Sequence, residues 1–499
     1  MGLFGLDAFV VQVENDISQG LPRFDLVGLP DAAVKESRER VRSSIINCKY
    51  KFPVSRMVVN IAPADIRKEG PIYDLPILMA VLSATGQIKF DLDGYVFVGE
   101  LSLDGSLRKV NGILPMIIKA RDEGYKGIFI PKENEREGSV IDSIDVFPAE
   151  NVDQIIRHFQ GHPIEKAFCE FDFDKRRELF PDFSDVKGQY EVKRALEVAA
   201  AGSHNVIMIG SPGAGKSMLA KRLPSILPEM TFEESVETTK IYSVAGLLPQ
   251  ETRLITGRPF RAPHHTVSPM GLAGGGSVPK PGEISLAHNG VLFLDELPEF
   301  SRQSMEILRQ PVEDGEITIS RVAGRLSYPS QVMLVCAMNP CPCGFYGHPT
   351  KACTCSKNVS KRYLAKISGP LLDRIDVHVE VQPVNYEQLS GKMKAETSAE
   401  IRKRVNRARE IQRARLEGTG IKCNAQMTPK ATREFCEMTD GAQRLLKVSF
   451  EKLDLSARAY DKILRISRTI ADLAESGTIE AEHVAEALQY RALDRKFWR

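Results

Sequence analysis

The stretch GSPGAGKS, residues 210–217, combines glycines with a lysine and a serine in the order that binds nucleotide phosphates. The apolar run NVIMI precedes it and the helical stretch MLAKRL follows it. Glycines let successive backbone N–H groups turn toward phosphate oxygens, and the start of a helix adds a favourable dipole. The predicted ATP-binding loop consists of Gly210, Ser211, Pro212, Gly213, Ala214, Gly215, Lys216, Ser217 and Met218.

Two acidic residues, Asp295 and Glu296, follow the apolar run VLFL. This pattern predicts a buried strand that carries both carboxylates at its end. Lys216 would contact the β- and γ-phosphates of ATP, and Ser217 and Asp295 would bind Mg²⁺. Glu296 would polarise the attacking water as a general base. Together these residues predict hydrolysis of ATP.

Two further residues follow predicted strands or helices at positions useful for this chemistry. The run VMLVCAM ends at Asn339, and in ring-forming ATPases a polar residue on this strand lies beside the γ-phosphate. Arg374, in SGPLLDRIDV, stands between a predicted helix and the next strand. An arginine there can reach a neighbouring subunit's nucleotide and stabilise the transition state. The alternative for Arg374 is a surface salt bridge.

Four cysteines follow Asn339 directly and form two Cys-X-Cys pairs, Cys341 with Cys343 and Cys353 with Cys355. Four thiolates in two pairs suit a tetrahedral zinc site, in which His348 could replace one thiolate. The alternatives are four reduced, unconnected thiols, or a disulfide, which a reducing compartment disfavours.

Apolar patterning divides the chain into three folded parts. Residues 1–164 predict an α/β domain, with strands in FVVQVENDI, RMVVNIAPAD, YVFVGELSLDG and GYKGIFIPKEN and a helix in DLPILMAVLSAT. The polar stretch 165–185 is typical of a linker. Residues 186–383 predict a second α/β unit that carries the nucleotide motifs, and residues 384–499 are predominantly helical.

The order GSPGAGKS, LFLDE, AMNP, LLDRIDV and LSARAYDKILRISRTIADL resembles the magnesium-chelatase-like AAA+ ATPases. With GLPDAAVKESRERVRSSI and NIAPADIRKEG, the chain is similar to the YifB/ComM group over essentially its whole length. The resemblance implies an N-terminal Lon-protease-like (ribosomal S5 domain 2-like) α/β domain, an AAA+ P-loop α/β core and a C-terminal α-helical lid. It also implies a homo-hexameric motor and a sensor-2 role for Arg458.

The same resemblance implies two insertions in the ATPase core. Residues 258–290 correspond to a helix-2 insert and residues 315–330 to a hairpin that precedes the strand of Asn339. Arg321 and Arg325 flank the hairpin tip Val322-Ala323-Gly324, where arginines in a hexamer's pore could follow a DNA backbone. The alternative is that they form solvated ion pairs.

Lon-type proteases use a serine and a lysine, and both are missing here. GPIYD places Ile72 at the serine position and NGILPM places Leu114 at the lysine position. An isoleucine offers no nucleophile and a leucine offers no base, so we expect no peptidase activity. The domain is expected to serve assembly or DNA binding instead.

Composition bounds these expectations. The chain of 499 residues is 42% hydrophobic and 26% charged with a formal net charge of +2, as in soluble multidomain proteins. It has no apolar run that could span a membrane and no signal-peptide pattern, so we expect a cytoplasmic protein. The basic run 401–416 distributes its charge around a helix, which favours a solvated helix over a DNA contact.

The resemblance implies an ATP-driven DNA helicase that promotes branch migration during natural transformation. Two alternatives are a magnesium-chelatase-type ATPase and a protein-remodelling regulator. The N-terminal domain and the cysteine quartet argue against the first. The hairpin tip, Val322-Ala323-Gly324 between two arginines, argues against the second, whose pore favours an aromatic-hydrophobic loop.

Overall fold

The computed structural model describes residues 1–168, 180–276, 279–321, 324–348, 350–384, 395–453, 455–491, 493 and 497–498. The chain forms two compact units, and both are discontinuous along the sequence. The first unit consists of Met1–Arg176, Phe232–Ile255 and Ser320–Leu326. The second consists of Arg177–Thr231, Thr256–Ile319 and Ser327–Arg499. Residues 169–179 of the predicted linker 165–185 lie outside the described residues.

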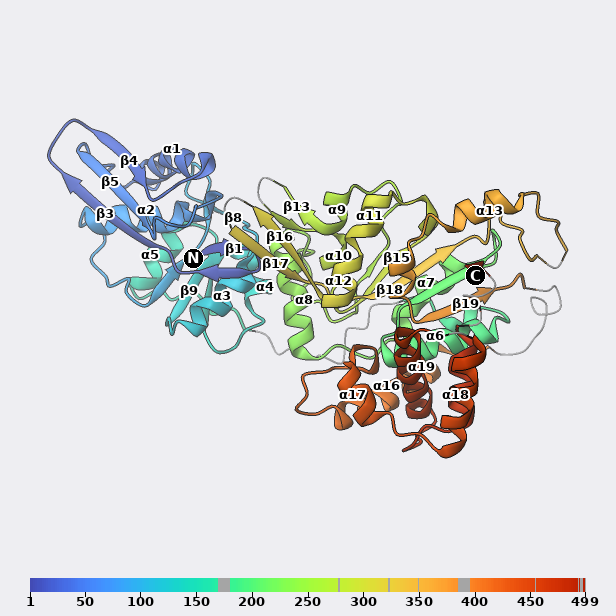
Figure 1. Cartoon of the computed structure of the whole chain (residues 1–499). Coiled ribbons are helices and arrows are strands. Elements are labelled where there is room, and N and C mark those ends of the chain that lie inside the picture. Colours follow the sequence, from blue (N-terminus) through green and yellow to red (C-terminus); the bar gives the residue numbers. More distant parts are fainter. Residues whose placement is uncertain are drawn as a thin grey trace. The chain divides into compact units, whose positions relative to one another are not determined.

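The first unit is an α/β domain with two three-stranded sheets (Figure 1). In one sheet the central strand β5 pairs antiparallel with β3 and parallel with β4. In the other, the central strand β9 pairs parallel with β10 and β6. The strands are β3 (Gln12–Ser18), β4 (Arg23–Val27), β5 (Arg56–Ala62), β6 (Tyr95–Phe97), β9 (Gly127–Pro131) and β10 (Asp145–Ala149).

The helices of this unit are α1 (Ala32–Asn47), α2 (Asp74–Ala84), α3 (Ile113–Asp122), α4 (Glu135–Gly138), α5 (Val152–Phe159) and α8 (Phe232–Ala245). The short strands are β1 (Gly2–Phe4), β2 (Asp7–Phe9), β7 (Glu100–Leu101) and β8 (Leu107–Arg108). Helix α2 is apolar and mostly buried, as its sequence predicts. The carboxylate of its first residue, Asp74, accepts hydrogen bonds from Nε and one terminal nitrogen of Arg40, at 2.6 and 3.0 Å. These bonds compensate for the burial of the carboxylate.

Helix α8 belongs to this unit although its sequence lies between motifs of the nucleotide site. It packs against α3, where the Ser243 carbonyl accepts the N–H of Gly112 at 3.2 Å. The Ser243 hydroxyl donates to the buried carboxylate of Glu137, which also accepts the N–H of Leu114 at 2.9 Å. A residue distant in sequence therefore completes a polar cluster within the N-terminal fold.

The second unit contains one five-stranded sheet in the order β12-β15-β18-β11-β19, with every pairing parallel. The strands are β11 (Val206–Gly210), β12 (Phe260–Arg261), β15 (Val291–Leu294), β18 (Met333–Met338) and β19 (Val377–Val381). Parallel pairing places the carboxyl ends of β11, β15 and β18 at one edge. The nucleotide motifs follow these three strands directly.

Shorter elements complete this part of the second unit. The helices are α6 (Tyr190–Gly202), α7 (Lys216–Arg222), α9 (Pro269–Ala273), α10 (Glu283–Leu286), α11 (Arg302–Ile307), α12 (Arg309–Asp314), α13 (Lys357–Leu364) and α14 (Gly369–Leu372). The strands β13 (Gly274–Gly275) and β14 (Lys280–Pro281) pair with each other. The strands β16 (Glu316–Arg321) and β17 (Gly324–Pro329) also pair, as the hairpin pattern predicts, although Ser320–Leu326 of this hairpin belong to the first unit.

The C-terminal part is helical, with α16 (Ser398–Arg415), α17 (Pro429–Phe435), α18 (Asp440–Leu453), α19 (Ala457–Leu473) and α20 (Ala481–Gln489). Helices α16 and α19 pack against α6 and share a continuous hydrophobic core with one face of the sheet. The predicted class, an α/β multidomain protein with a helical C-terminal domain, is confirmed. Part of the positive charge of α16 is paired within the chain, because Arg404 forms ion pairs with Glu197 and Glu396.

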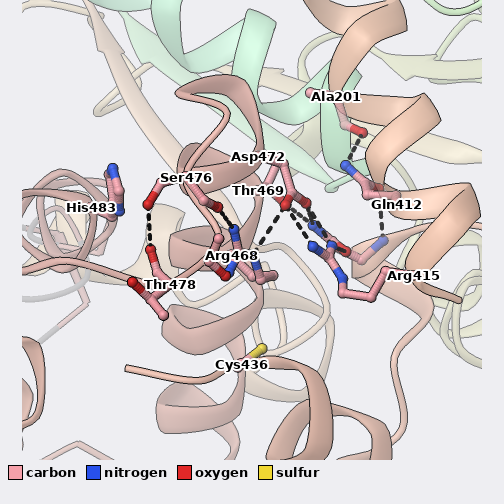
Figure 2. Close-up of polar contacts among 12 residues, drawn as sticks. Ala201, Gln412, Arg415, Cys436, Arg468, Thr469, Asp472, Ser476, Thr478 and His483 are labelled. Atoms are coloured by element: carbon pink, nitrogen blue, oxygen red, sulfur yellow. Dashed lines mark hydrogen bonds and ion pairs between the residues drawn. The ribbon is translucent and has the colours of Figure 1, made fainter. Parts of the chain in front are cut away.

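Buried charges tie the helical domain together (Figure 2). Asp472 of α19 is fully buried and accepts two nitrogens of Arg415 at 2.7 Å each. It also accepts Nε of Arg468 at 3.0 Å and the amide of Asn424 at 2.8 Å. Four donors on one carboxylate fix α16 and α19 relative to each other.

In the part of the chain that the structure describes, no helix is both long enough and apolar enough to cross a membrane.

Candidate functional site

The loop between β11 and α7 has the backbone that phosphate binding requires. Gly213 and Gly215 have φ angles of 77° and 94°, in the left-handed region that favours glycine. At Gly210 a Cβ atom would collide with the Val381 carbonyl of the neighbouring strand β19. Helix α7 begins at Lys216, so its free N–H groups face the loop. This arrangement offers backbone donors to an anion.

Lys216 lies at the centre of the loop and is largely buried. Its ammonium donates to the carbonyls of Gly210 at 2.7 Å and Ser211 at 3.0 Å, and to Asn339 Oδ1 at 3.0 Å. Burial lowers the pKa of Lys216, and the charges of Asp295 and Glu296 oppose that shift. The loop and the end of β18 therefore converge on one cation.

Ser217 and Asp295 are in direct contact, with the serine hydroxyl 2.5 Å from Asp295 Oδ2. The other oxygen, Oδ1, accepts the N–H of Glu296 at 2.9 Å. A hydroxyl and a carboxylate at the end of a strand are hard oxygen ligands of the kind Mg²⁺ takes beside a phosphate. The two residues fit the magnesium site that the sequence predicts, and this assignment stays a prediction.

Glu296 adopts a left-handed backbone conformation, with φ 53° and ψ 44°. Such a conformation costs roughly 1–2 kcal/mol for a residue other than glycine. It accompanies a sharp turn after β15 that leaves the Glu296 side chain 58% exposed. The carboxylate is thus accessible to water beside the predicted phosphate position, as a general base must be.

His265 is a component of the site that the sequence motifs did not identify. Its Nδ1 lies 3.2 Å from Glu296 Oε2, and its ring contacts the ring of His264 with centroids 4.1 Å apart. It lies in the segment 258–290, which contains β12, α9, β13, β14 and α10 in its described part. The adjacent histidines in APHHT were the available signal, but nothing local indicated that they meet Glu296.

Arg374 lies between α14 and β19 and is bonded within its own chain. Its Nε donates to the Arg309 carbonyl at 2.9 Å, and a terminal nitrogen donates to the Pro370 carbonyl at 2.7 Å. The remaining nitrogen pairs with the exposed carboxylate of Glu313. The contact with Glu313 is the salt bridge that we gave as the alternative role of Arg374. The role at a neighbouring subunit's nucleotide stays a prediction and requires release of Glu313.

Arg458 is the second residue of α19, and its side chain is 72% exposed. A terminal nitrogen lies 3.9 Å from Asp373 Oδ2, beside Arg374 in the chain. Ser456 caps the helix by accepting the N–H of Ala459 at 3.2 Å, which fixes where α19 begins. The guanidinium is free to reorient, so its sensor-2 role stays a prediction.

The four predicted cysteines form one cluster, with all four Sγ atoms within 4.8 Å of one another. Cys341 Sγ lies 3.3 Å from that of Cys343 and 3.7 Å from that of Cys353, and the last two are 3.5 Å apart. Zn–S bonds of about 2.3 Å in a tetrahedron place sulfurs ~3.8 Å apart. The cluster therefore fits a metal ion of that size.

The electrostatics of the cluster favour a thiolate at one position. The backbone N–H of Phe345 is the main cause that lowers the pKa of Cys343 to about 5. The N–H of Cys343 in turn lies 3.4 Å from Cys355 Sγ. The group of candidate metal ligands contains the four cysteines and not His348, whose Nδ1 accepts the N–H groups of Thr350 and Lys351.

The remaining predicted residues lie in the first unit. Arg325 of β17 is exposed, whereas the side chain of Arg321 and the tip residues Val322 and Ala323 lie outside the described residues. Ile72 sits in a short 3-10 helix, and Leu114 is buried in the first turn of α3. Both carry only hydrocarbon side chains and pack in hydrophobic clusters.

Comparison with known proteins agrees with this geometry. The family model for magnesium chelatase subunit ChlI matches residues 182–389, the model for its C-terminal part matches residues 395–491, and the model for subunit ChlI of Mg-chelatase matches residues 13–134.

Individual relatives extend over nearly the whole chain. The competence protein ComM of Haemophilus influenzae is 43% identical over 98% of this chain and 96% of that protein. The uncharacterized protein YifB of Escherichia coli is 42% identical with the same coverage. The Lon protease of Mycolicibacterium smegmatis is 25% identical over 31% of this chain and 21% of that protein. The chain therefore belongs to the YifB/ComM family of magnesium-chelatase-like AAA+ ATPases.

Proposed function

We propose that this protein is an ATP-driven DNA motor that works as a homo-hexamer and promotes branch migration of recombination intermediates during natural transformation. The similarity to a relative named a competence protein supports the biological setting. The observation that carries the proposal is the position of the β16–β17 hairpin in the chain. It separates β15, which leads to Glu296, from β18, which leads to Asn339. A hairpin so placed is connected in the chain to two strands that each lead to a residue of the predicted nucleotide site.

In this proposal the hairpins of six subunits face the strand of DNA that passes through the ring. The exposed Arg325 and its neighbour Arg321 contact phosphates, so binding is independent of base sequence and weakens with salt. The substrate is branched or single-stranded DNA. Each hydrolysis event shifts one hairpin relative to the next and advances the DNA.

The chain's own residues divide the hydrolysis step among them. Lys216 leaves its carbonyl partners to bind the β- and γ-phosphates, and Ser217 with Asp295 would hold Mg²⁺, which neutralises phosphate charge. Glu296 accepts the proton of the attacking water, which Asn339 orients. Arg374 of one subunit approaches the γ-phosphate bound by the neighbouring subunit. Arg458 of that neighbouring subunit contacts the same nucleotide from the helical lid.

The cysteine cluster belongs to the same proposal as a zinc site. Cys341, Cys343, Cys353 and Cys355 supply four soft sulfur ligands at separations close to those of a tetrahedral site. A closed four-sulfur shell has no open position for substrate, so the metal there is structural.

The test is the ATPase rate with and without a branched DNA junction. We expect strong stimulation by the junction, no activity in Lys216→Ala, and loss of stimulation in Arg321→Ala/Arg325→Ala. Arg407→Ala is the matched control, because this exposed arginine of α16 already pairs with Glu410 and Glu475. A rate that ignores DNA in every form overturns the motor proposal.

The matches to magnesium chelatase models favour one second candidate, a chelatase-type ATPase that remodels a partner protein. That candidate predicts an ATPase indifferent to DNA and stimulated by a protein partner. The same assay therefore separates the two.

A further inference from the structure

The cysteine loop touches the phosphate-binding loop at two places. Asn339, two residues before Cys341, holds the ammonium of Lys216 at 3.0 Å through Oδ1. Gly344, one residue after Cys343, lies directly against the ring of Pro212, so a Cβ atom there would come within 2.7 Å of Pro212 Cγ. The backbone turn beside the thiols thus packs against the proline ring of the phosphate-binding loop.

The position of Gly344 depends on the cysteines beside it. Its N–H donates to the Cys341 carbonyl at 3.0 Å, which closes a tight turn, and its φ of 82° is left-handed. Cys341 is fully buried, while the other three cysteines are only partly buried. The loop also makes contacts such as that of the Tyr346 ring with Phe497, and a metal bound by all four thiols would add a constraint that joins Cys341 and Cys343 to Cys353 and Cys355.

We propose that the metal held by the four cysteines sets the position of the phosphate-binding loop through the contact between Gly344 and Pro212, so that ATP affinity depends on metal occupancy. The proposal rests on the zinc and ATP sites described above and adds their coupling. Removal of the metal frees the Gly344 turn and leaves Pro212 without its packing partner. The loop glycines then sample conformations that do not bind phosphate.

The first experiment measures the dissociation constant of a fluorescent ATP analogue without DNA. Protein with a confirmed zinc content is stripped with a chelator under reducing conditions, and its fold is checked by circular dichroism. We expect affinity to fall by about tenfold to a hundredfold, and to recover when one equivalent of Zn²⁺ is added. Unchanged affinity in stripped, folded protein overturns the proposal, as does full affinity in protein that never binds zinc.

The second experiment tests the contact without touching a thiol. Gly344→Ala places a methyl group against Pro212, and we expect ATP affinity to fall about tenfold with zinc content unchanged. Gly418→Ala is the control, because Gly418 has a similar φ of 77° and nothing within 4 Å of an added Cβ. Alanine at Gly418 introduces a similar backbone strain, but its methyl group contacts no neighbouring segment.

A double variant closes the argument. Pro212→Ala removes the ring that the new methyl group meets, so Gly344→Ala should weaken ATP binding less in that background. Equal effects of Gly344→Ala in both backgrounds overturn the coupling. Because the readout is ATP binding alone, a protein that fails the DNA test still gives an answer here.

Discussion

His265 and Glu296 form a close pair in the nucleotide site, with Nδ1 of the imidazole 3.2 Å from Oε2 of the carboxylate. The histidine comes from the segment between β12 and α9, and the glutamate follows β15. The predicted general base is therefore oriented by a residue of the predicted insertion.

We expect Glu296→Gln to lower kcat by roughly 10²–10⁴-fold while ATP binding is retained, because only the proton acceptor is lost. His265→Ala should lower kcat by less, about tenfold, with KM for ATP nearly unchanged, because His265 acts through Glu296. His265→Gln keeps a polar group and should recover part of the rate. Steady-state kinetics over a range of ATP concentrations measure all three.

His264→Ala is the control for this pair, since His264 Nδ1 is bonded to Thr266 rather than to Glu296. A His265→Ala enzyme with raised KM and unchanged kcat would assign His265 to binding and contradict the positioning role.

The buried carboxylate of Glu137 predicts a pH dependence of stability. Burial raises its pKa above the ordinary 4.5, against the donors Ser243, Leu114 and Asn134. The folded state then binds more protons than the unfolded state between these two values. The free energy of unfolding therefore falls as pH rises from about 4.5 through the raised pKa. Glu137→Gln removes this contribution.

Urea unfolding of the wild type and Glu137→Gln at intervals from about pH 4.5 to 8 measures the effect. Glu135→Gln, at an exposed carboxylate of the same helix α4, is the control. Parallel pH profiles for the wild type and Glu137→Gln would contradict the prediction.

The Asp472 cluster predicts a large loss of stability on neutralisation. Asp472→Asn leaves Arg415 and Arg468 without their shared carboxylate in a buried site, which typically costs 3–5 kcal/mol. Chemical denaturation followed by circular dichroism gives the free energy of unfolding. Glu410→Gln breaks an exposed ion pair with Arg407 and should cost no more than about 1 kcal/mol. Similar costs for the two variants would show that burial does not amplify the Asp472 cluster.

Local patterns in the sequence predicted several elements of the fold. The alternation in RMVVNIAPAD predicts β5, which spans Arg56–Ala62, and the apolar stretch beginning at Asp74 predicts α2. The expected helix from Ala457 is α19. These elements were predictable because the period of apolar residues reports which face is buried. The basic run that we expected to be solvated is α16, and several of its arginines form ion pairs.

Contacts between distant segments were not predictable in the same way. The motifs placed Lys216, Asp295 and Asn339 near nucleotide because each follows a strand of one parallel sheet. Three contacts illustrate this: His265 with Glu296, Gly344 with Pro212, and Ser243 with Glu137. They depend on how the fold brings distant segments together, which the local periodicity of apolar residues does not indicate. The lone tryptophan, Trp498, packs in a hydrophobic cluster beside His378, which is another contact between distant segments.

The discontinuous first unit affects how this protein can be taken apart. The polypeptide chain enters and leaves the first unit more than once. Two segments of that unit, Phe232–Ile255 and Ser320–Leu326, lie in sequence between segments of the second unit. A fragment that starts after residue 180 would still carry α8, now with Ser243 stripped of Glu137, and the hairpin residue Leu326 without its neighbour Gly5. Such a fragment would expose apolar surface that the full-length protein buries, and it would not represent an intact ATPase domain. The effects of deleting N-terminal residues would therefore reflect damage to segments carried by the ATPase part of the chain as well as loss of the N-terminal domain.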